Sequence, residues 1–394
     1  MKNKYSISII AVLIVIAPFV NLLHQIAPMF LFSKSAWVAI PTITLAIVFV
    51  INLTKINRIN QIACLLGIVL LGFLVLQISL VVYEDSINIL DYRYILTFPM
   101  YLIMAEFFSR REDSRKFLAT ALIIQGMLVS IIFIINVHFF SNVLIEQDDS
   151  GMNAFSFDGE LTRNMLLGAS TSGNMILIAM FALAFRKLIN QKFINAVFWP
   201  LQLCMIYAIS LGGSRYPFIG GLCVLLFCIF LKKNHLGNLY SLLITVICIF
   251  GFVALFKIET KEIFRYDLDF GGRVEKIQLA ISLIFDSVTH FFIGPSRAVV
   301  ANTISTGGYG FSDNSYLAIA LSFGTPFAFL FFLYLISYTN LKKNNGLYKL
   351  FTIYFFLGFG VSNCIYWESY IFIATFCWLL LSRQPSNFSL KHLG

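Results

Sequence analysis

The sequence predicts an all-α, polytopic membrane protein, and two observations lead to this fold class. Hydrophobic residues make up 59% of the 394 positions, the mean hydropathy is +0.85, and apolar runs recur along the whole chain. Lipid cannot satisfy backbone amides, so such runs are typical of membrane helices, which satisfy them internally. Charge is the second observation, because 18 of the 28 Lys and Arg residues lie in alternate gaps between the runs and 16 of the 19 Asp and Glu residues lie in the other gaps. These observations exclude a soluble globular chain.

The apolar runs define about twelve predicted transmembrane helices, most of them close to the ~20 residues that cross a bilayer. Their ranges are 6–23, 36–53, 61–82, 90–108, 117–140, 165–185, 194–211, 217–231, 239–256, 315–338, 348–364 and 366–382. The eighth run is short, and the connection between the last two, at Cys364 and Ile365, is almost absent. We expect residues 1–394 to form a single integral membrane domain.

The basic residues predict the orientation of these helices. Gaps rich in Lys and Arg face the cytoplasm, which places both termini on the cytoplasmic side of the membrane. Those residues are Lys2, Lys4, Lys55, Arg58, Arg110, Arg111, Arg115, Lys116, Arg186, Lys187, Lys192, Lys232, Lys233, Lys342, Lys343, Lys349, Arg383 and Lys391. The net charge of +9 is therefore a topology signal, and no nucleic-acid partner is expected. No small-residue cleavage site follows the first apolar run, so we expect it to be retained as a helix.

Two outward gaps are long enough to form extracytoplasmic loops. The first, 141–164, is acidic, and the second, 257–314, is the longest gap in the chain. Within the second, apolar and polar residues each recur at three- and four-residue steps, which predicts an amphipathic helix lying over the bundle. Its apolar face would hold Val274, Ile277, Ile281, Ile284, Phe285 and Val288, and its polar face Glu275, Gln278, Ser282, Asp286 and Thr289. Glycines at 271–272 mark its start, and Gly294 and Pro295 its end.

Metal and disulfide sites are not expected in this chain. All seven cysteines lie in or next to apolar runs without metal-ligand spacing, so they are predicted to be small hydrophobic residues. Asp267 and Asp269 form an Asp-x-Asp pair of the kind that can hold a divalent cation, but solvated loop carboxylates are the simpler interpretation. We therefore expect that this chain needs neither a metal nor a cofactor.

Four segments resemble the O-antigen polymerase and O-antigen ligase family. The stretch GGRVEKIQLAISLIFDSVTHFFIGPS, followed by FSDNSYLAIALSFGTPFAFL, is similar to that family's long periplasmic loop and the helix after it. The matching landmarks are Arg273, Gly294, Asn314, Leu317 and Gly324. RNMLLGASTSGNMILIAM is similar to the family's Gly-Asn-bearing helix start, and GGSRYPFIGG to its Ser-Arg turn. The resemblance covers roughly residues 160–340, and it lies in the order and placement of these segments.

The resemblance implies transfer of a sugar chain from an undecaprenyl-diphosphate carrier to a sugar hydroxyl on the periplasmic side of the inner membrane. Where the ligases carry a His, this chain has Asp313, which favours a polymerase over a ligase. A polymerase needs donor and acceptor oligosaccharides that are both lipid-linked, and a chain-length regulator protein is a further possible partner. O-antigen ligase, which transfers polysaccharide to lipid A core, remains the first alternative.

Arginines are the predicted binders of the departing diphosphate, because the guanidinium group is planar, always charged and bidentate toward phosphate oxygens. Arg215 and Arg273 are the first candidates for catalysis. Arg215 lies in the turn at 212–215, where an interfacial arginine without catalytic use is the alternative interpretation. A solvated charge is the alternative for Arg273. Arg163, Arg297 and Arg93 are predicted substrate-binding residues, although Arg93 lies between two tyrosines and can equally belong to an aromatic belt.

The acceptor hydroxyl needs a base, and Asp313 is the candidate because it ends the long loop just before a helix. A helix N-cap is an equally weighted alternative for Asp313. Asn314 and Asn174 are predicted substrate-binding residues, although small residues around Asn174 also favour close helix packing. His290 lies in the long loop, and packing is favoured for it over proton transfer.

A lipid-linked oligosaccharide flippase or another transporter is the second alternative. Ion-coupled carriers usually hold a carboxylate near the middle of the bilayer. Glu106 lies inside a predicted span, and its spacing from Arg110 predicts an ion pair near the cytoplasmic end. The long outward loop also favours an enzyme over a transporter.

Overall fold

The residues that the structure describes fold almost entirely into helices in this computed structural model. The structure describes residues 2–19, 43–51, 59–83, 93–140, 169–188, 192–211, 215–230, 270–296, 314–339, 346–361 and 368–383. None of the residues in these ranges forms a β-strand. The prediction of an all-α chain is therefore confirmed for the described part of the molecule.

The helices follow the predicted apolar runs closely. In chain order they are α1 (Lys2–Ile16), the short 3-10 turn η1 (Ala17–Phe19), α4 (Ile59–Tyr83), α5 (Arg93–Ser109), α6 (Glu112–Phe140), α8 (Ala169–Leu188), α9 (Lys192–Leu211), α10 (Arg215–Phe230), α13 (Phe270–Phe285), α14 (Val288–Ile293), α16 (Ser315–Phe323), α17 (Thr325–Ser337), α18 (Gly346–Val361) and α19 (Glu368–Ser382). Residues 43–51 are also helical. The predicted run 239–256 lies outside the described residues, as does the loop 141–164.

Among the described residues, two helical segments are long and apolar enough to cross a membrane, namely Leu66–Tyr83 and Glu112–Ile135. Six shorter apolar helices accompany them. The count of about twelve spans therefore stays a prediction, whereas the helices that would form most of them are present. Leucine, isoleucine and valine make up most of the first of these segments, and no charged residue interrupts it.

Two predicted helices are each divided in the structure. The run 315–338 is broken at Gly324, whose φ of 80° ends α16, and Pro326 then stands in the first turn of α17. The amphipathic helix ends at Phe285 and is followed by α14, which Ser287 caps by accepting from the His290 amide. Gly294 ends α14 as predicted. The predicted start was wrong, because α13 begins at Phe270 and includes both glycines.

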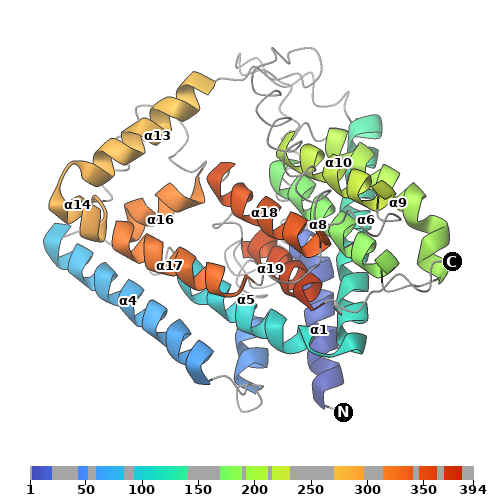
Figure 1. The fold of residues 1–394 in the computed structure, drawn as a ribbon, viewed down its shortest axis with the longest axis horizontal. Coiled ribbons are helices and arrows are strands. Elements are labelled where there is room, and N and C mark those ends of the chain that lie inside the picture. The colour runs from blue at the N-terminus through green and yellow to red at the C-terminus, as the bar shows by residue number, and fades with distance from the viewer. Residues whose placement is uncertain are drawn as a thin grey trace.

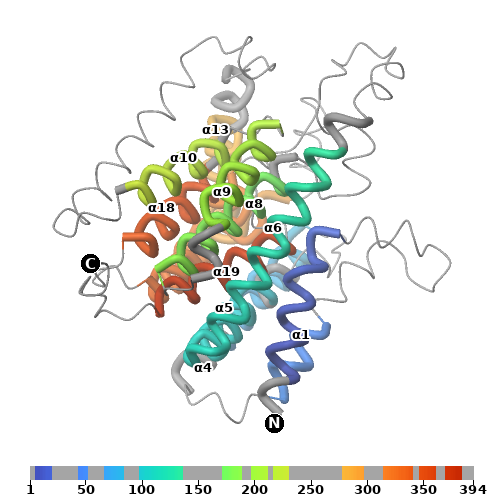
Figure 2. Tube along the Cα trace, turned by 90° about the vertical axis from the view of Figure 1, so that its right-hand side faces the viewer, coloured from blue at the N-terminus to red at the C-terminus, as the bar shows by residue number. Residues whose placement is uncertain are grey.

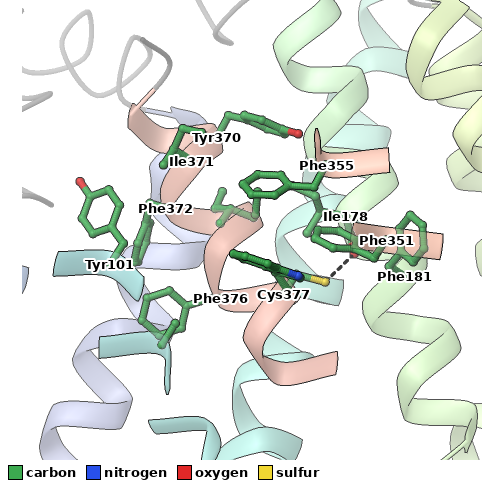
Figure 3. Close-up of a cluster of buried hydrophobic side chains, with 14 of the residues drawn as sticks. Tyr101, Ile178, Phe181, Phe351, Phe355, Tyr370, Ile371, Phe372, Phe376 and Cys377 are labelled. Carbon is green, nitrogen blue, oxygen red and sulfur yellow. Dashed lines mark hydrogen bonds between the residues drawn. The ribbon is translucent and has the colours of Figure 1, made fainter. Parts of the chain in front are cut away.

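Helices α8 and α19 form the centre of the bundle (Figures 1 and 2). Helix α8 contacts α6, α9, α10, α18 and α19, and its residues 171–186 are all buried. Figure 3 shows how α19 fills the space between its neighbours. Phe372 of α19 lies 5.4 Å from the Tyr101 ring of α5, and the Cys377 thiol donates to the Ile178 carbonyl of α8 at 3.7 Å. Interlocking aromatic pairs of this kind stabilise a core beyond their buried area.

The two ends of the bundle are joined by separate sets of contacts. At one end the Tyr83 hydroxyl donates to the Gly294 carbonyl at 2.9 Å. At the other, Arg383 binds the Glu106 carboxylate at 2.7 Å, and Arg110 lies 4.0 Å from the same oxygen. Each set joins residues that the charge pattern assigns to the same side of the membrane. The predicted Glu106–Arg110 pair is therefore present, but the closer partner of Glu106 comes from the end of α19.

Cysteine behaviour agrees with the prediction at three of the described positions. Cys204, Cys228 and Cys377 are free thiols, and the last two are buried. Cys223 differs, because it is disulfide-bonded. The expectation that no cysteine forms a disulfide was therefore wrong for this residue, because a disulfide depends on how close two cysteines lie in the fold.

Candidate functional site

The second half of α18 is surrounded by polar side chains from three other helices. We call these residues the tyrosine–amide cluster: Asn174, Tyr216, Asn314, Tyr316 and Tyr354. They come from α8, α10, α16 and α18 itself. Helices α10 and α16 begin at this cluster, and helix N-termini carry partial positive charge, whereas α18 ends there.

The first half of the cluster links α8, α10 and α18. The Tyr216 ring stacks on the Tyr354 ring with centroids 4.4 Å apart and an interplanar angle of 16°. The Tyr216 hydroxyl donates to the Tyr354 backbone carbonyl, and the Tyr354 hydroxyl donates to Oδ1 of the buried Asn174. Buried amides need such partners, so this chain of contacts holds the three helices in one arrangement.

The second half of the cluster joins α16 to α18. Asn314 caps α16, because its Oδ1 accepts from the amides of Tyr316 at 3.0 Å and Leu317 at 3.1 Å. Its Nδ2 donates to the Gly360 carbonyl at 3.1 Å, in the last turn of α18. The Tyr316 hydroxyl donates to the Phe356 carbonyl at 2.8 Å. The Asn314 side chain thus provides hydrogen-bond partners for backbone amides at the start of α16 and for a backbone carbonyl at the end of α18.

The helices α13 and α14 lie against the far side of α16. The backbones of the two segments lie close together there. A Cβ added to Gly294 would stand 2.3 Å from the Leu321 carbonyl oxygen, and a Cβ added to Gly324 would stand 2.1 Å from the Phe292 carbonyl oxygen. Both glycines also have φ near +80°, which other residues rarely adopt. The two glycines that match the family landmarks are therefore neighbours in space, and each one makes room for the other segment.

Three of the predicted arginines belong to helices that the structure describes. Arg215 is the first residue of α10 and directly precedes Tyr216 of the cluster. Arg273 lies in α13, which packs on α16, and Arg93 is the first residue of α5. Arg163, Arg297 and Asp313 lie outside the described residues. Arg215 is accordingly the predicted arginine that the described structure brings next to the cluster.

The two predicted asparagines have structural partners. Asn174 is buried and bonded to Tyr354, which favours the packing interpretation over direct contact with a substrate. Asn314 uses its oxygen for the cap and its nitrogen for α18, so its role here is to position α16. The N-cap of α16 is therefore Asn314, and the alternative role of Asp313 as that cap was wrong. Asp313 immediately precedes this anchored residue.

His290 packs as expected. Its Nδ1 lies 3.0 Å from the Leu283 carbonyl and 3.7 Å from the Asp286 carboxylate, and its ring is 6.2 Å from that of Tyr83. These contacts tie α14 to α13 and to the end of α4. Within the described ranges, no group of three His, Cys, Asp or Glu residues could hold a metal ion.

Sequence reasoning missed the tyrosines of the cluster. Tyr216 directly follows Arg215, and Tyr316 stands two residues after Asn314. A local signal was available, because each tyrosine lies at the end of an apolar run, where aromatic residues with a polar tip gather. The hydrogen-bond partners of Tyr216 and Tyr316 lie on α18, so the spacing of residues along the chain could not predict them.

Comparisons of this chain with protein-family models, curated proteins and solved structures found no match. The likeness to the O-antigen polymerase and ligase family therefore remains a prediction that rests on the four sequence segments.

Proposed function

We propose that this chain is a membrane glycosyltransferase that polymerises a surface polysaccharide. It joins oligosaccharide repeat units, each carried on undecaprenyl diphosphate, on the extracytoplasmic side of the inner membrane. The growing chain leaves one carrier lipid and is added to the unit on another, so the site accepts two lipid-linked glycans. The membrane supplies both substrates, and a chain-length regulator protein is the proposed macromolecular partner.

One observation carries the proposal: three of the four segments that resemble the family meet at α18, and the fourth, the loop-helix segment, packs on α16. Asn174, from the segment RNMLLGASTSGNMILIAM, binds Tyr354. Tyr216, from the segment GGSRYPFIGG, stacks on the same tyrosine. Asn314, from the segment FSDNSYLAIALSFGTPFAFL, binds the same helix α18 at Gly360. Gly294 ends the loop-helix segment and packs against α16. Segments separated by more than a hundred residues thus share one neighbourhood, as the parts of a single site would.

The proposed chemistry is an inverting displacement at the anomeric carbon of the donor. The acceptor hydroxyl oxygen forms a bond to that carbon while the bond to the diphosphate oxygen breaks, and the diphosphate leaves with the electron pair. Asp313 takes the proton from the acceptor hydroxyl. Arg215 and Arg273 bind the diphosphate as its charge increases, which lowers the barrier because their charge is already in place. Arg163, Arg297 and Arg93 would bind the remaining phosphate and sugar oxygens.

Deletion of the gene in its native host, followed by separation of lipopolysaccharide by size, tests the proposal. Loss of a polymerase leaves lipid A core capped with a single repeat unit. Bare core with polymer accumulating on the carrier lipid would instead identify a ligase. Single units retained on the cytoplasmic leaflet would identify a flippase and overturn the proposed activity.

Complementation with point variants then tests the residues. Arg215→Ala and Arg273→Ala should give the single-unit pattern at normal protein levels, and Asp313→Asn should do the same because it keeps the size of the side chain but not its basicity. Arg111→Ala is the matched control, since Arg111 is exposed at the opposite end of the bundle. If Arg215→Ala and Arg273→Ala both gave near-normal ladders, these arginines would not be catalytic. The deletion experiment would still test whether the protein is a polymerase.

A further inference from the structure

Helices α13 and α14 do not bury the whole apolar face that the sequence gives them. Ala280 and Ile284 are buried against the bundle. A second apolar stripe, which we call the outer stripe, remains exposed beside that contact: Ile277, Ile281, Phe285, Val288 and Phe292. Phe285 is 65% exposed, Val288 75% and Phe292 55%, so this is bare hydrocarbon and ring surface. A stripe of this kind needs a nonaqueous neighbour.

The polar residues of the same helices lie on a different face. Gln278, Ser282, Asp286 and Thr289 are exposed and recur at steps of four, four and three residues, one position after Ile277, Ile281, Phe285 and Val288. Around α13 this order places Ile277, Ile281 and Phe285 between the buried face and the polar face. A helix with that arrangement is suited to lie flat in an interface, with one side on the protein, one in hydrocarbon and one in water.

The position of α14 places the outer stripe at the end of a long apolar helix. Figure 1 shows α13, α14 and α4 following one another along one edge of the molecule. Helix α14 contacts α4 and α17, and the Tyr83 hydroxyl at the end of α4 binds the Gly294 carbonyl. The segment Leu66–Tyr83 of α4 is long and apolar enough to cross a membrane, and Leu70, Phe73 and Val81 on it are exposed. The apolar surface of α4 therefore continues onto α14.

We infer that α13 and α14 form an interfacial anchor whose outer stripe is seated in the lipid of the outer leaflet. Lipid is the occupant because the outer stripe continues the exposed surface of α4, which itself needs hydrocarbon around it. Tyr83 and His290 then lie at headgroup level, where rings with a polar atom gather. The inference concerns where the long outward loop is seated, and it does not depend on the proposed polymerase activity.

Photocrosslinking tests the anchor in the full chain. A benzophenone-bearing amino acid is placed at Val288, at Phe292 or at Ser282, and each purified variant is reconstituted in vesicles of phosphatidylethanolamine and phosphatidylglycerol. After irradiation, Val288 and Phe292 should yield the mass of a protein–phospholipid adduct. Ser282 is the control because it is exposed on the polar face of the adjoining helix α13, and it should yield no lipid adduct above background.

Several results would overturn the anchor. A covalent dimer at Val288 and Phe292 would assign the outer stripe to a second copy of the chain. The absence of any lipid adduct at both positions would place the stripe in water, and equal lipid labelling at Ser282 would mean that the polar face does not point away from the bilayer. If the Phe292 variant aggregates, the exposed Phe285 serves as the second ring position.

Discussion

The Tyr216 hydroxyl donates to the backbone carbonyl of Tyr354 while the two rings stack 4.4 Å apart. This double contact fixes the start of α10 on the side of α18, one residue after Arg215. A side chain that directly follows a proposed catalytic arginine is therefore held by a rigid helix and not by a loop. Preorganisation of this kind is what an electrostatic site requires.

The room for Tyr216 comes from a glycine, and this leads to the first prediction. A Cβ on Gly358 would stand 3.1 Å from the Tyr216 hydroxyl oxygen, closer than ordinary contact. We expect Gly358→Ala to displace Tyr216 and Arg215 and to reduce polymer formation about tenfold, which corresponds to ~1.4 kcal/mol in the barrier. The measurement is repeat-unit transfer with purified lipid-linked substrate.

Gly360→Ala is the control for that variant. Its new Cβ would meet no atom closer than 3.8 Å, which is ordinary van der Waals contact. The same substitution two residues further along α18 should therefore leave transfer unchanged. Equal activity of the two alanine variants would show that Tyr216 does not need its position.

The second prediction compares two hydroxyl deletions. Tyr354→Phe removes the donor to the buried Asn174 oxygen, and loss of a partner for a buried polar atom costs about 1–3 kcal/mol. Tyr216→Phe removes a donor to a carbonyl that lies inside α18 and keeps its place in the helical ladder. Thermal unfolding in detergent should therefore show the larger loss for Tyr354→Phe. The reverse order would contradict the assignment of Asn174 as a buried structural amide.

The third prediction concerns the junction between α14 and α16. Gly324→Ala places a Cβ against the Phe292 carbonyl and forces a φ of 80° that costs other residues about 1–2 kcal/mol. We expect a loss of folding free energy above ~2 kcal/mol and a clear fall in membrane yield.

Gly67→Ala in α4 supplies the comparison for Gly324→Ala. Nothing lies within 4 Å of the Cβ that it would add, and alanine favours a helix by up to ~1 kcal/mol over glycine. This variant should match or exceed the parent protein in thermal stability. Two alanine variants of equal stability would mean that the backbone contact at Gly324 is not as close as the structure has it.

The fourth prediction contrasts two ion pairs of equal length. Arg383 and Glu106 are 2.7 Å apart, and the Glu106 side chain is only 8% exposed. Lys116 and Glu112 are also 2.7 Å apart, but both side chains are substantially exposed. Double-mutant cycles with Arg383→Ala and Glu106→Gln should give a coupling of about 1–3 kcal/mol, because removal of Arg383 takes away the partner that lies 2.7 Å from a buried carboxylate.

The exposed pair should couple far more weakly. Exposed pairs at i,i+4 spacing contribute roughly 0.3–0.5 kcal/mol, and salt screens them further. Raising the ionic strength should therefore remove the Lys116–Glu112 coupling and leave most of the Arg383–Glu106 coupling. Identical salt dependence of both cycles would indicate that the end of α19 does not shield Glu106.

Much of the secondary structure follows from local patterns. Apolar runs bounded by charges predict the helices because each pattern lies within one segment. The break at Gly324 was also within reach, since a glycine followed two residues later by a proline typically ends one helix and starts the next. Ser287, which caps α14, is a similar local signal inside the predicted amphipathic helix.

By itself the sequence determined that the described part of this protein is helical and apolar, and where most of these helices lie along the chain. Only the tertiary structure decided that Glu106 binds Arg383 across 277 positions, that Tyr216 stacks on Tyr354, and that half of the apolar face of α13 stays uncovered. The physical reason is range. Hydrophobic periodicity and capping act within a few turns of one helix, whereas these contacts depend on which helices pack against each other. Many alternative pairings of helices would bury a similar apolar area at a similar free energy, so the sequence pattern does not distinguish them.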